Sequence, residues 1–336
     1  MIGDINKRDY SISFVRCIAM FSIFLCHILH EYNNILAGWL DVGVQIFFFI
    51  SGYLYSSKKI SSIKTFYVKN LFKLLNDYYI FISIYILILY FLGKLTGISN
   101  ILETIFLKPS ISGLGHLWFI RFILFCYIFT PIFQNILNYI MSKKNRFYIA
   151  HMLISAIVIE LFFSHILHIT GAWFVCYFLG MCYKRIEDNN KLLKLRLFAG
   201  VSFITILLCI LRIYLYYKSN TPYFTYRYIW CYSHVFLGIF IFFVARYLYI
   251  KIQYYLNLHL NNILSISDKY SYDFYIVHYS LIVGYFRIIN LTPNTYLNIF
   301  IVFLSTCILA KILNLISNAI FIRFKQKLNL LGGRVE

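Results

Sequence analysis

The sequence predicts an all-α fold, a polytopic transmembrane bundle of about ten helices, and two observations lead to it. Hydrophobic residues make up 61% of the 336-residue chain and charged residues only 13%, whereas about half and a quarter are usual in a soluble domain. Apolar stretches of about 20 residues, the length that crosses a bilayer, recur throughout, and most charges lie between them. We therefore expect a multi-pass membrane protein with one transmembrane domain, 1–336.

Each predicted span is an apolar run that ends where basic or polar residues begin. The connections between runs are too short to fold alone, the longest being about 20 to 25 residues. We find no cleavable signal peptide, because the first run is too long for one and lacks a small-residue cleavage site. The spans lie at 11–30, 36–56, 77–93, 116–138, 147–164, 170–183, 197–216, 228–245, 271–288 and 297–321.

Lysine and arginine are distributed unevenly between alternate connections, which predicts the orientation. The segment before the first span, every second connection after it and the segment after the last span together hold 22 of these residues. The remaining connections hold 5. The positive-inside rule then places both termini in the cytoplasm. The net charge of +19 is thus a topology signal with some attraction to anionic lipid, and we expect no nucleic acid partner.

The eight cysteines are scattered in or beside spans, without a CxxC pair or a metal-like grouping. We interpret them as small packing residues rather than disulfides or ligands, and we predict no metal.

Arg16 and His27 lie in the first span. A lysine or arginine at the bilayer centre costs roughly 2.5–3.5 kcal/mol, so ionisable residues inside a span need an explanation. The separation of Arg16 and His27 by eleven residues amounts to three helical turns plus about 20°, so both side chains share one helix face, about 16 Å apart. One interpretation is a snorkelling arginine and an interfacial histidine. The other is a polar track with a cation near the cytoplasmic side and a titratable imidazole near the outer side.

Five sequence blocks resemble, in order, those of the acyltransferase-3 family of membrane proteins, which acylate carbohydrates and other cell-surface molecules. The hallmark of that family is an arginine, ten residues and a histidine in the first span, which Arg16 and His27 match. The similarity runs from about residue 9 to residue 320, and we expect no appended esterase-like domain. The other blocks are "GVQIFFFISGYL" (43–54), "HLWFIRFILFCYIFTPIF" (116–133), "WFVCYFLGM" (173–181) and "SYDFYIVHYS" (271–280).

The resemblance implies a cytoplasmic acyl-CoA donor, acetyl-CoA in the first instance, and an acceptor sugar on the far side. We expect His27 to act as the catalytic base, since an imidazole titrates near neutral pH. An acetyl-histidine intermediate is the alternative. His116, at the outer start of the fourth span, is expected to orient His27 or to stabilise the oxyanion.

Cationic side chains are expected to bind the phosphates of the donor. Arg16 and Arg121 are two of these cofactor-binding candidates, and Lys69 and Lys73 in the stretch "VKNLFKLLNDYY" are the others. That stretch departs from the family, which usually has arginines and a proline there, and lysine cannot bind phosphate in a bidentate manner. Candidates for the substrate channel are Ser51, Trp118, Tyr275 and His278.

The leading function is O-acetylation of a bacterial surface polysaccharide, such as O-antigen, capsule or exopolysaccharide, or of its lipid-linked oligosaccharide precursor. The chain would then reside in the bacterial inner (cytoplasmic) membrane, in contact with membrane lipid. Alternatives are another acyl group such as succinyl, a non-sugar acceptor, and a flippase or transporter of lipid-linked glycans.

Overall fold

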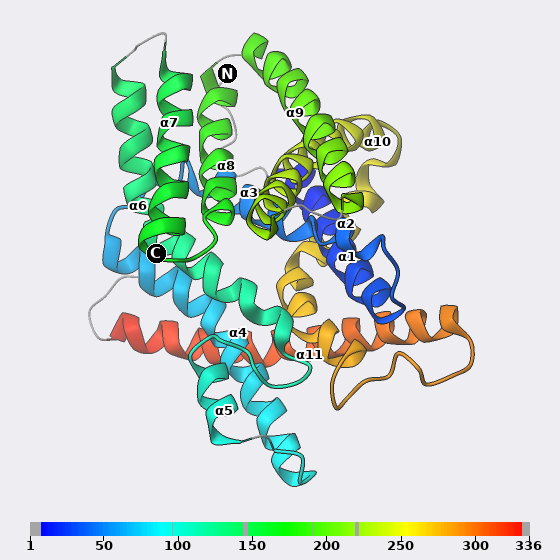
Figure 1. The fold of residues 1–336 in the computed structure, drawn as a ribbon. Coiled ribbons are helices and arrows are strands. Elements are labelled where there is room, and N and C mark those ends of the chain that lie inside the picture. Colours follow the sequence, from blue (N-terminus) through cyan, green and yellow to red (C-terminus); the bar gives the residue numbers. More distant parts are fainter. Residues whose placement is uncertain (1–7, 96, 144–146, 190, 219–221, 331–336) are drawn as a thin grey trace. The chain divides into compact units, whose positions relative to one another are not determined.

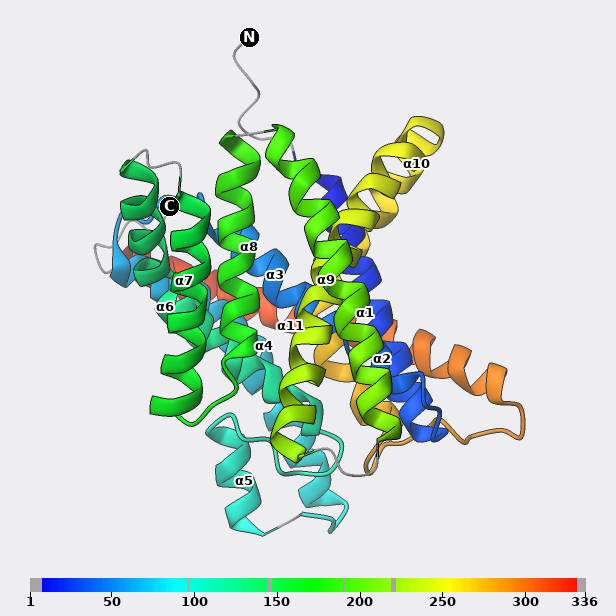
Figure 2. The same cartoon turned by 45° about the horizontal axis from the view of Figure 1, so that its top comes forward.

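The structure is a computed structural model that describes residues 8–95, 97–143, 147–189, 191–218 and 222–330. Within these residues it has helices and no strand, which confirms the all-α prediction. Lys7, Lys144, Arg146 and Arg334, which the count of basic residues included, lie outside the described residues. The helices, shown in Figures 1 and 2, are α1 (Tyr10–Glu31), α2 (Ala37–Leu40), α3 (Gly43–Tyr55), α4 (Ile63–Phe91), α5 (Ile98–Ile105), α6 (Trp118–Ser142), α7 (Tyr148–Leu161), α8 (Ala172–Asn189), α9 (Lys191–Tyr217), α10 (Tyr223–Ile282) and α11 (Thr295–Leu330).

Eight segments of the described chain are helical, long and apolar enough to cross a membrane, and they match eight of the ten predicted spans. The other two predicted spans are also helical. One, 170–183, forms most of α8, whose last turns carry charged residues from Lys184 to Asp188. The other, 271–288, forms the end of α10 and stops six residues early, at Ile282. The chain is therefore a polytopic helical membrane protein.

Two helices extend well beyond the apolar runs that predicted them. The α4 helix begins at Ile63 rather than 77, because the Ser62 side chain caps it by accepting from the Thr65 amide. The α10 helix continues through the basic stretch after residue 245, so the predicted connection there is helical. A hydropathy pattern therefore predicts the apolar part of these helices and misses their polar extensions.

The chain divides into two compact units. The first unit comprises Met1–Ile23, Gly38–Lys58 and Ile132–Asp268. Its α3 and α8 helices are in close contact. A Cβ on Gly52 would collide with the Tyr177 backbone, and one on Gly180 with the Phe49 carbonyl. Glycine permits this backbone approach, as is common in membrane helix pairs.

The second unit comprises Phe24–Ala37, Lys59–Pro131 and Lys269–Glu336. Its α4 and α11 helices pack together, and polar side chains join them. The Asn76 amide donates to the Ser317 hydroxyl at 2.8 Å, and that hydroxyl donates to Asp77.

The segment that leads into His116 is fixed to α4 and to the residues after α10. Tyr78 donates to the Thr104 carbonyl at the end of α5, and Tyr85 donates to the Ser112 carbonyl at 2.8 Å. Gly113 and Gly284 have φ of +86° and +102°, and their backbones are so close that a Cβ on Gly284 would lie 2.7 Å from the Gly113 Cα. Only glycine tolerates both conditions, and the short 3₁₀ turn that carries His116 follows directly.

Candidate active site

Three histidines and two tyrosines of the second unit meet in one cluster, which we term the histidine cluster: His27, His116, Tyr275, His278 and Tyr279. The His27 ring centroid lies 5.2 Å from that of His278 and 6.2 Å from that of His116. The rings of His116 and His278 are 5.0 Å apart. His116 and His278 are buried, whereas His27 is partly exposed. Two helices, α1 and α10, and a turn thus bring together residues far apart in the sequence.

A single backbone carbonyl fixes both buried histidines. The Tyr275 carbonyl accepts from His116 Nε2 at 2.9 Å and from His278 Nδ1 at 2.8 Å. The Tyr275 hydroxyl also donates to the His116 carbonyl. Since a carbonyl only accepts, the hydrogen-bond network assigns a proton to each of these two ring nitrogens.

The opposite nitrogen of each buried ring carries a lone pair. In the neutral form of each ring, these bonds leave His116 Nδ1 and His278 Nε2 as acceptors. Both atoms are buried, and neither has a hydrogen-bond partner among the described residues. Since a buried acceptor without a partner costs roughly 1–3 kcal/mol, the cluster is built to receive a donor.

Tyr279 completes the cluster beside the partly exposed histidine. Its ring centroid lies 4.6 Å from His27 and 4.9 Å from His116. No group of three or more His, Cys, Asp or Glu side chains in the described part of the chain has an arrangement that could hold a metal ion. The side chains that gather in the histidine cluster are three imidazoles and two phenols.

Arg16 lies on α1 in the first unit, in a cluster of charges. Its Nη1 donates to Asp268 Oδ1 at 2.6 Å, and Arg8 binds the other carboxylate oxygen. Burial opposes ionisation of Asp268, but the charges and hydrogen bonds of the two arginines outweigh it and lower the pKa of that carboxyl. Two guanidinium groups and one carboxylate leave one net positive charge, and 30% of the Arg16 side chain is exposed.

Lys69 and Lys73 both lie exposed on α4. The charge of Lys73 acts on two nearby acids, Asp77 and Asp273. Acidic side chains therefore lie close to the basic ones in this part of the second unit.

The remaining candidates have various surroundings. In the second unit, the Arg121 guanidinium lies 4.9 Å from the Phe122 ring centre. The Arg121 Nε is buried and has no hydrogen-bond partner in the described part of the chain. The Trp118 ring contacts Phe122 edge-on at 5.7 Å. In the first unit, Ser51 is half-buried on α3, next to Gly52. None of these three belongs to the histidine cluster as defined above.

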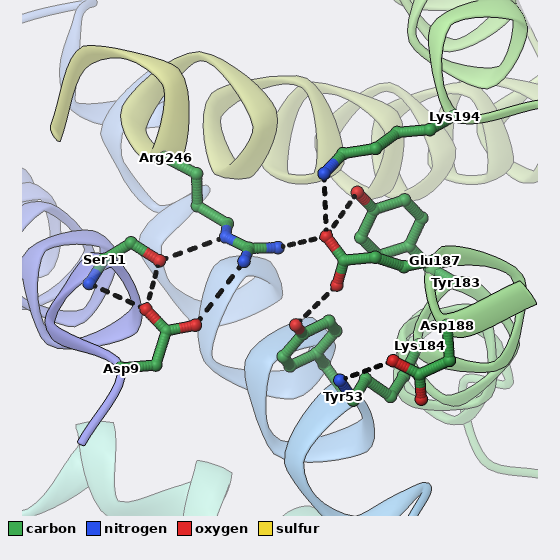
Figure 3. Close-up of polar contacts among 9 residues, drawn as sticks. All are labelled: Asp9, Ser11, Tyr53, Tyr183, Lys184, Glu187, Asp188, Lys194 and Arg246. Carbon is green, nitrogen blue, oxygen red and sulfur yellow. Dashed lines mark hydrogen bonds and ion pairs between the residues drawn. The ribbon is translucent and has the colours of Figure 1, made fainter. Parts of the chain in front are cut away.

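A second polar cluster, in the first unit, surrounds Arg246 and is shown in Figure 3. We term it the ionic cluster: Asp9, Ser11, Tyr53, Tyr183, Glu187, Lys194 and Arg246. Arg246 Nη1 donates to Glu187 Oε1 at 2.9 Å, and its Nε donates to Ser11 Oγ at 3.1 Å. The other Glu187 oxygen accepts from the Tyr53 hydroxyl at 2.5 Å.

Comparison with known proteins identifies the family. A family model described as an acyltransferase domain matches residues 9–315. The chain belongs to the acyltransferase-3 family. No curated protein and no solved structure matches it. It is therefore a membrane acyltransferase, and the match includes every residue of the histidine cluster.

Sequence reasoning missed two residues of this acyltransferase. Tyr279 lies within the block "SYDFYIVHYS" but was not singled out, because one of 31 tyrosines gives no signal by itself. Asp268 was missed because its contact with Arg16 spans 252 residues. Its only local signal is that it is an acid in a basic stretch, in a chain with just 12 acids.

Proposed function

We propose that this acyltransferase transfers an acetyl group from acetyl-CoA to a hydroxyl of a bacterial surface polysaccharide or of its lipid-linked precursor. The single observation that carries the proposal is the histidine cluster, in which two buried acceptor nitrogens flank a partly exposed imidazole. Acyl transfer to a hydroxyl needs a base for the hydroxyl proton, and His27 is the histidine of the cluster that a substrate can reach. The proposed location is the inner membrane, with the donor on the cytoplasmic side.

In the proposed reaction, the acceptor oxygen attacks the thioester carbon, forming a C–O bond and breaking the C–S bond. His27 takes the hydroxyl proton and passes it to the departing thiolate of coenzyme A, so the base is regenerated. A neutral imidazole suits both steps, because it binds a proton at one nitrogen and keeps another N–H at the other. Direct transfer therefore requires no other base.

The buried histidines support that base. While His27 is protonated, its second N–H requires an acceptor, and His278 Nε2 and His116 Nδ1 are acceptors without partners. The His27–His278 centroid distance of 5.2 Å is suited to an N–H···N bond that tightens when substrate binds, as catalytic hydrogen bonds often do. His278 and His116 are thus positioning residues, analogous to the third member of a catalytic triad.

The donor phosphates are assigned to the cationic side chains. Arg16 contributes the net positive charge that remains after its pairing with Asp268. Arginine has five N–H donors, so its bond to Asp268 leaves others for a phosphate. Lys69, Lys73 and Arg121 are the further candidates for donor binding.

The test is transfer of radiolabel from acetyl-CoA to the glycan of the source cell by the purified full-length protein in nanodiscs. Labelled glycan that is absent with His27→Ala supports the proposal. Succinyl-CoA and longer acyl-CoAs run in parallel reveal whether another acyl group is preferred. If no acyl-CoA yields labelled glycan while the protein moves lipid-linked glycan across the bilayer, the proposed transfer is wrong.

A further inference from the structure

The first unit contains a pocket that the proposed chemistry does not use, between the C-terminal end of α7 and the start of α10. Its volume is about 140 Å³, and its walls include Glu160, Ser164, Thr170, Arg227 and Tyr232. Basic residues such as Lys143 precede α7, so the positive-inside rule places this end of α7 on the outer side of the membrane. The acceptor is expected on that side.

One lining residue of the pocket, Glu160, has a carboxylate held in a fixed orientation. Glu160 Oε1 accepts from the Ser164 hydroxyl at 2.6 Å, and Oε2 accepts from the Tyr232 hydroxyl at 2.6 Å. The backbone of Gly171 lies so close that a Cβ there would be 2.7 Å from the Glu160 Cδ. A π-helical turn, Phe162–Ile166, follows α7 and contributes Ser164 to the lining, and such turns are frequent at functional sites.

The pocket offers acceptors and donors together. A carboxylate has about four lone-pair positions, of which Ser164 and Tyr232 use two. On another wall, Arg227 donates from Nη2 to the Thr170 hydroxyl at 3.1 Å, and its other N–H groups extend the donor set. An anion would be repelled by the carboxylate and a cation by the guanidinium, so an uncharged group that both donates and accepts fits best.

The pocket has room for about one ring of a ligand. A cavity of about 150 Å³ holds a molecule the size of benzene, whereas whole drug-sized ligands need about 300 Å³ or more. Tyr228 and Tyr232 add aromatic rings to the lining, which suit the apolar C–H face of a sugar.

We propose that this pocket binds one neutral pyranose ring of the acceptor glycan, with Glu160 and Arg227 as its hydrogen-bonding residues. That the bound sugar belongs to the acceptor glycan rests on the proposed function, whereas the sugar site itself depends only on the pocket. It gives the first unit a role in recognising the glycan.

The test is saturation-transfer NMR of the full-length protein in nanodiscs with methyl glucopyranoside and methyl galactopyranoside, without acyl-CoA. We expect binding to wild type and to His27→Ala, and at least about tenfold weaker binding to Glu160→Gln and Arg227→Ala. The matched control is Arg287→Ala, an exposed arginine that pairs with Glu31 and does not line the pocket. In transfer assays, the pocket variants should raise KM for the glycan and leave KM for acetyl-CoA unchanged.

The outcomes separate this inference from the proposed function. Absence of glycoside binding, or equal binding by the pocket variants and wild type, overturns the sugar site even if acetyl transfer proceeds. Preferential saturation of choline, or displacement of the glycosides by inorganic phosphate, overturns it in favour of a charged ligand. Glycoside binding without transfer from any acyl-CoA leaves the sugar site standing and removes the proposed reaction. Glu160→Gln changes a side chain that is hydrogen-bonded to Ser164 and Tyr232. If this variant fails to fold, Arg227→Ala, at an exposed residue, keeps the test decisive.

Discussion

The histidine cluster and the ionic cluster are both polar groups inside a mostly apolar protein, and they differ in how their hydrogen bonds are satisfied. In the ionic cluster, both Glu187 oxygens have donors, and all three Arg246 nitrogens have acceptors. In the histidine cluster, two buried ring nitrogens have no partner among the described residues.

This difference indicates different roles. A satisfied network of charges stabilises one arrangement of helices, because removal of one member leaves the others buried and unpaired. A network with unused buried acceptors is costly for folding, and its persistence points to a ligand or a proton that satisfies it during the reaction. We expect changes in the histidine cluster to affect turnover and changes in the ionic cluster to affect stability.

The largest expected effect is that of His27→Ala, which removes the proposed base. General base catalysis contributes about 10²–10⁴-fold, so kcat for acetyl transfer should fall by about 10³-fold with the melting temperature little changed. The matched control is His30→Ala, an exposed histidine one turn further along α1, which should retain wild-type kcat. Equal losses in the two variants would remove the distinction between the clusters.

The second effect tests the ionic cluster through Arg246→Ala. The Arg246 and Glu187 side chains are only 17% and 13% exposed, and breaking a buried pair leaves an uncompensated charge. We expect a loss of about 3 kcal/mol of stability, measured by thermal or denaturant unfolding in detergent, with kcat per folded molecule unchanged.

Asp188→Ala is the control for Arg246→Ala. It removes the nearby Lys184–Asp188 pair, whose carboxylate is 47% exposed, so only about 0.3–0.5 kcal/mol should be lost. If Arg246→Ala lowered kcat per folded molecule and left the stability close to that of wild type, the ionic cluster would belong to the catalytic apparatus.

A third prediction concerns His278 as a positioning residue. His278→Asn keeps a donor for the Tyr275 carbonyl but removes the Nε2 acceptor, so kcat should fall by about tenfold, equivalent to one ordinary hydrogen bond. KM for acetyl-CoA should not change. His278→Gln, whose longer side chain places an amide oxygen near the Nε2 position, should restore part of the loss. A fall in kcat that tracks loss of folded protein, without rescue by glutamine, would assign His278 a purely structural role.

Most of the fold was predictable because apolar length is the dominant constraint on a membrane helix. The early start of α4 and the continuity of α10 were not, since a helix that leaves the bilayer becomes polar and resembles a connection in hydropathy. Ser62 was the one local signal, as serine is a favoured N-cap.

The site was predictable in part, and for a different reason. His27 and His278 are ionisable residues in apolar spans, and the family resemblance also points to His116 and Tyr275. The structure brings these four together. Their spacing along the chain could not show that one carbonyl, that of Tyr275, orients both buried imidazoles. The contact of Arg16 with Asp268 was equally invisible, because long-range pairs depend on tertiary structure. The roles of all these residues remain predictions, and kinetic measurements on the variants test them.

The last prediction concerns the pH dependence of stability that Glu187 contributes. Burial opposes its ionisation, but the hydrogen bond from Tyr53 and the charges of Arg246 and Lys194 outweigh it and lower the pKa of the carboxyl from 4.5 to about 2. A carboxyl with a lowered pKa in the folded state stabilises the protein above its unfolded pKa, and this contribution is lost as pH falls through the folded value. The melting temperature in detergent should therefore decline between pH 4.5 and about 2, and Glu187→Gln should flatten that decline while lowering stability at neutral pH. An unchanged slope in the variant would show that the ionic cluster does not hold Glu187 in its charged form.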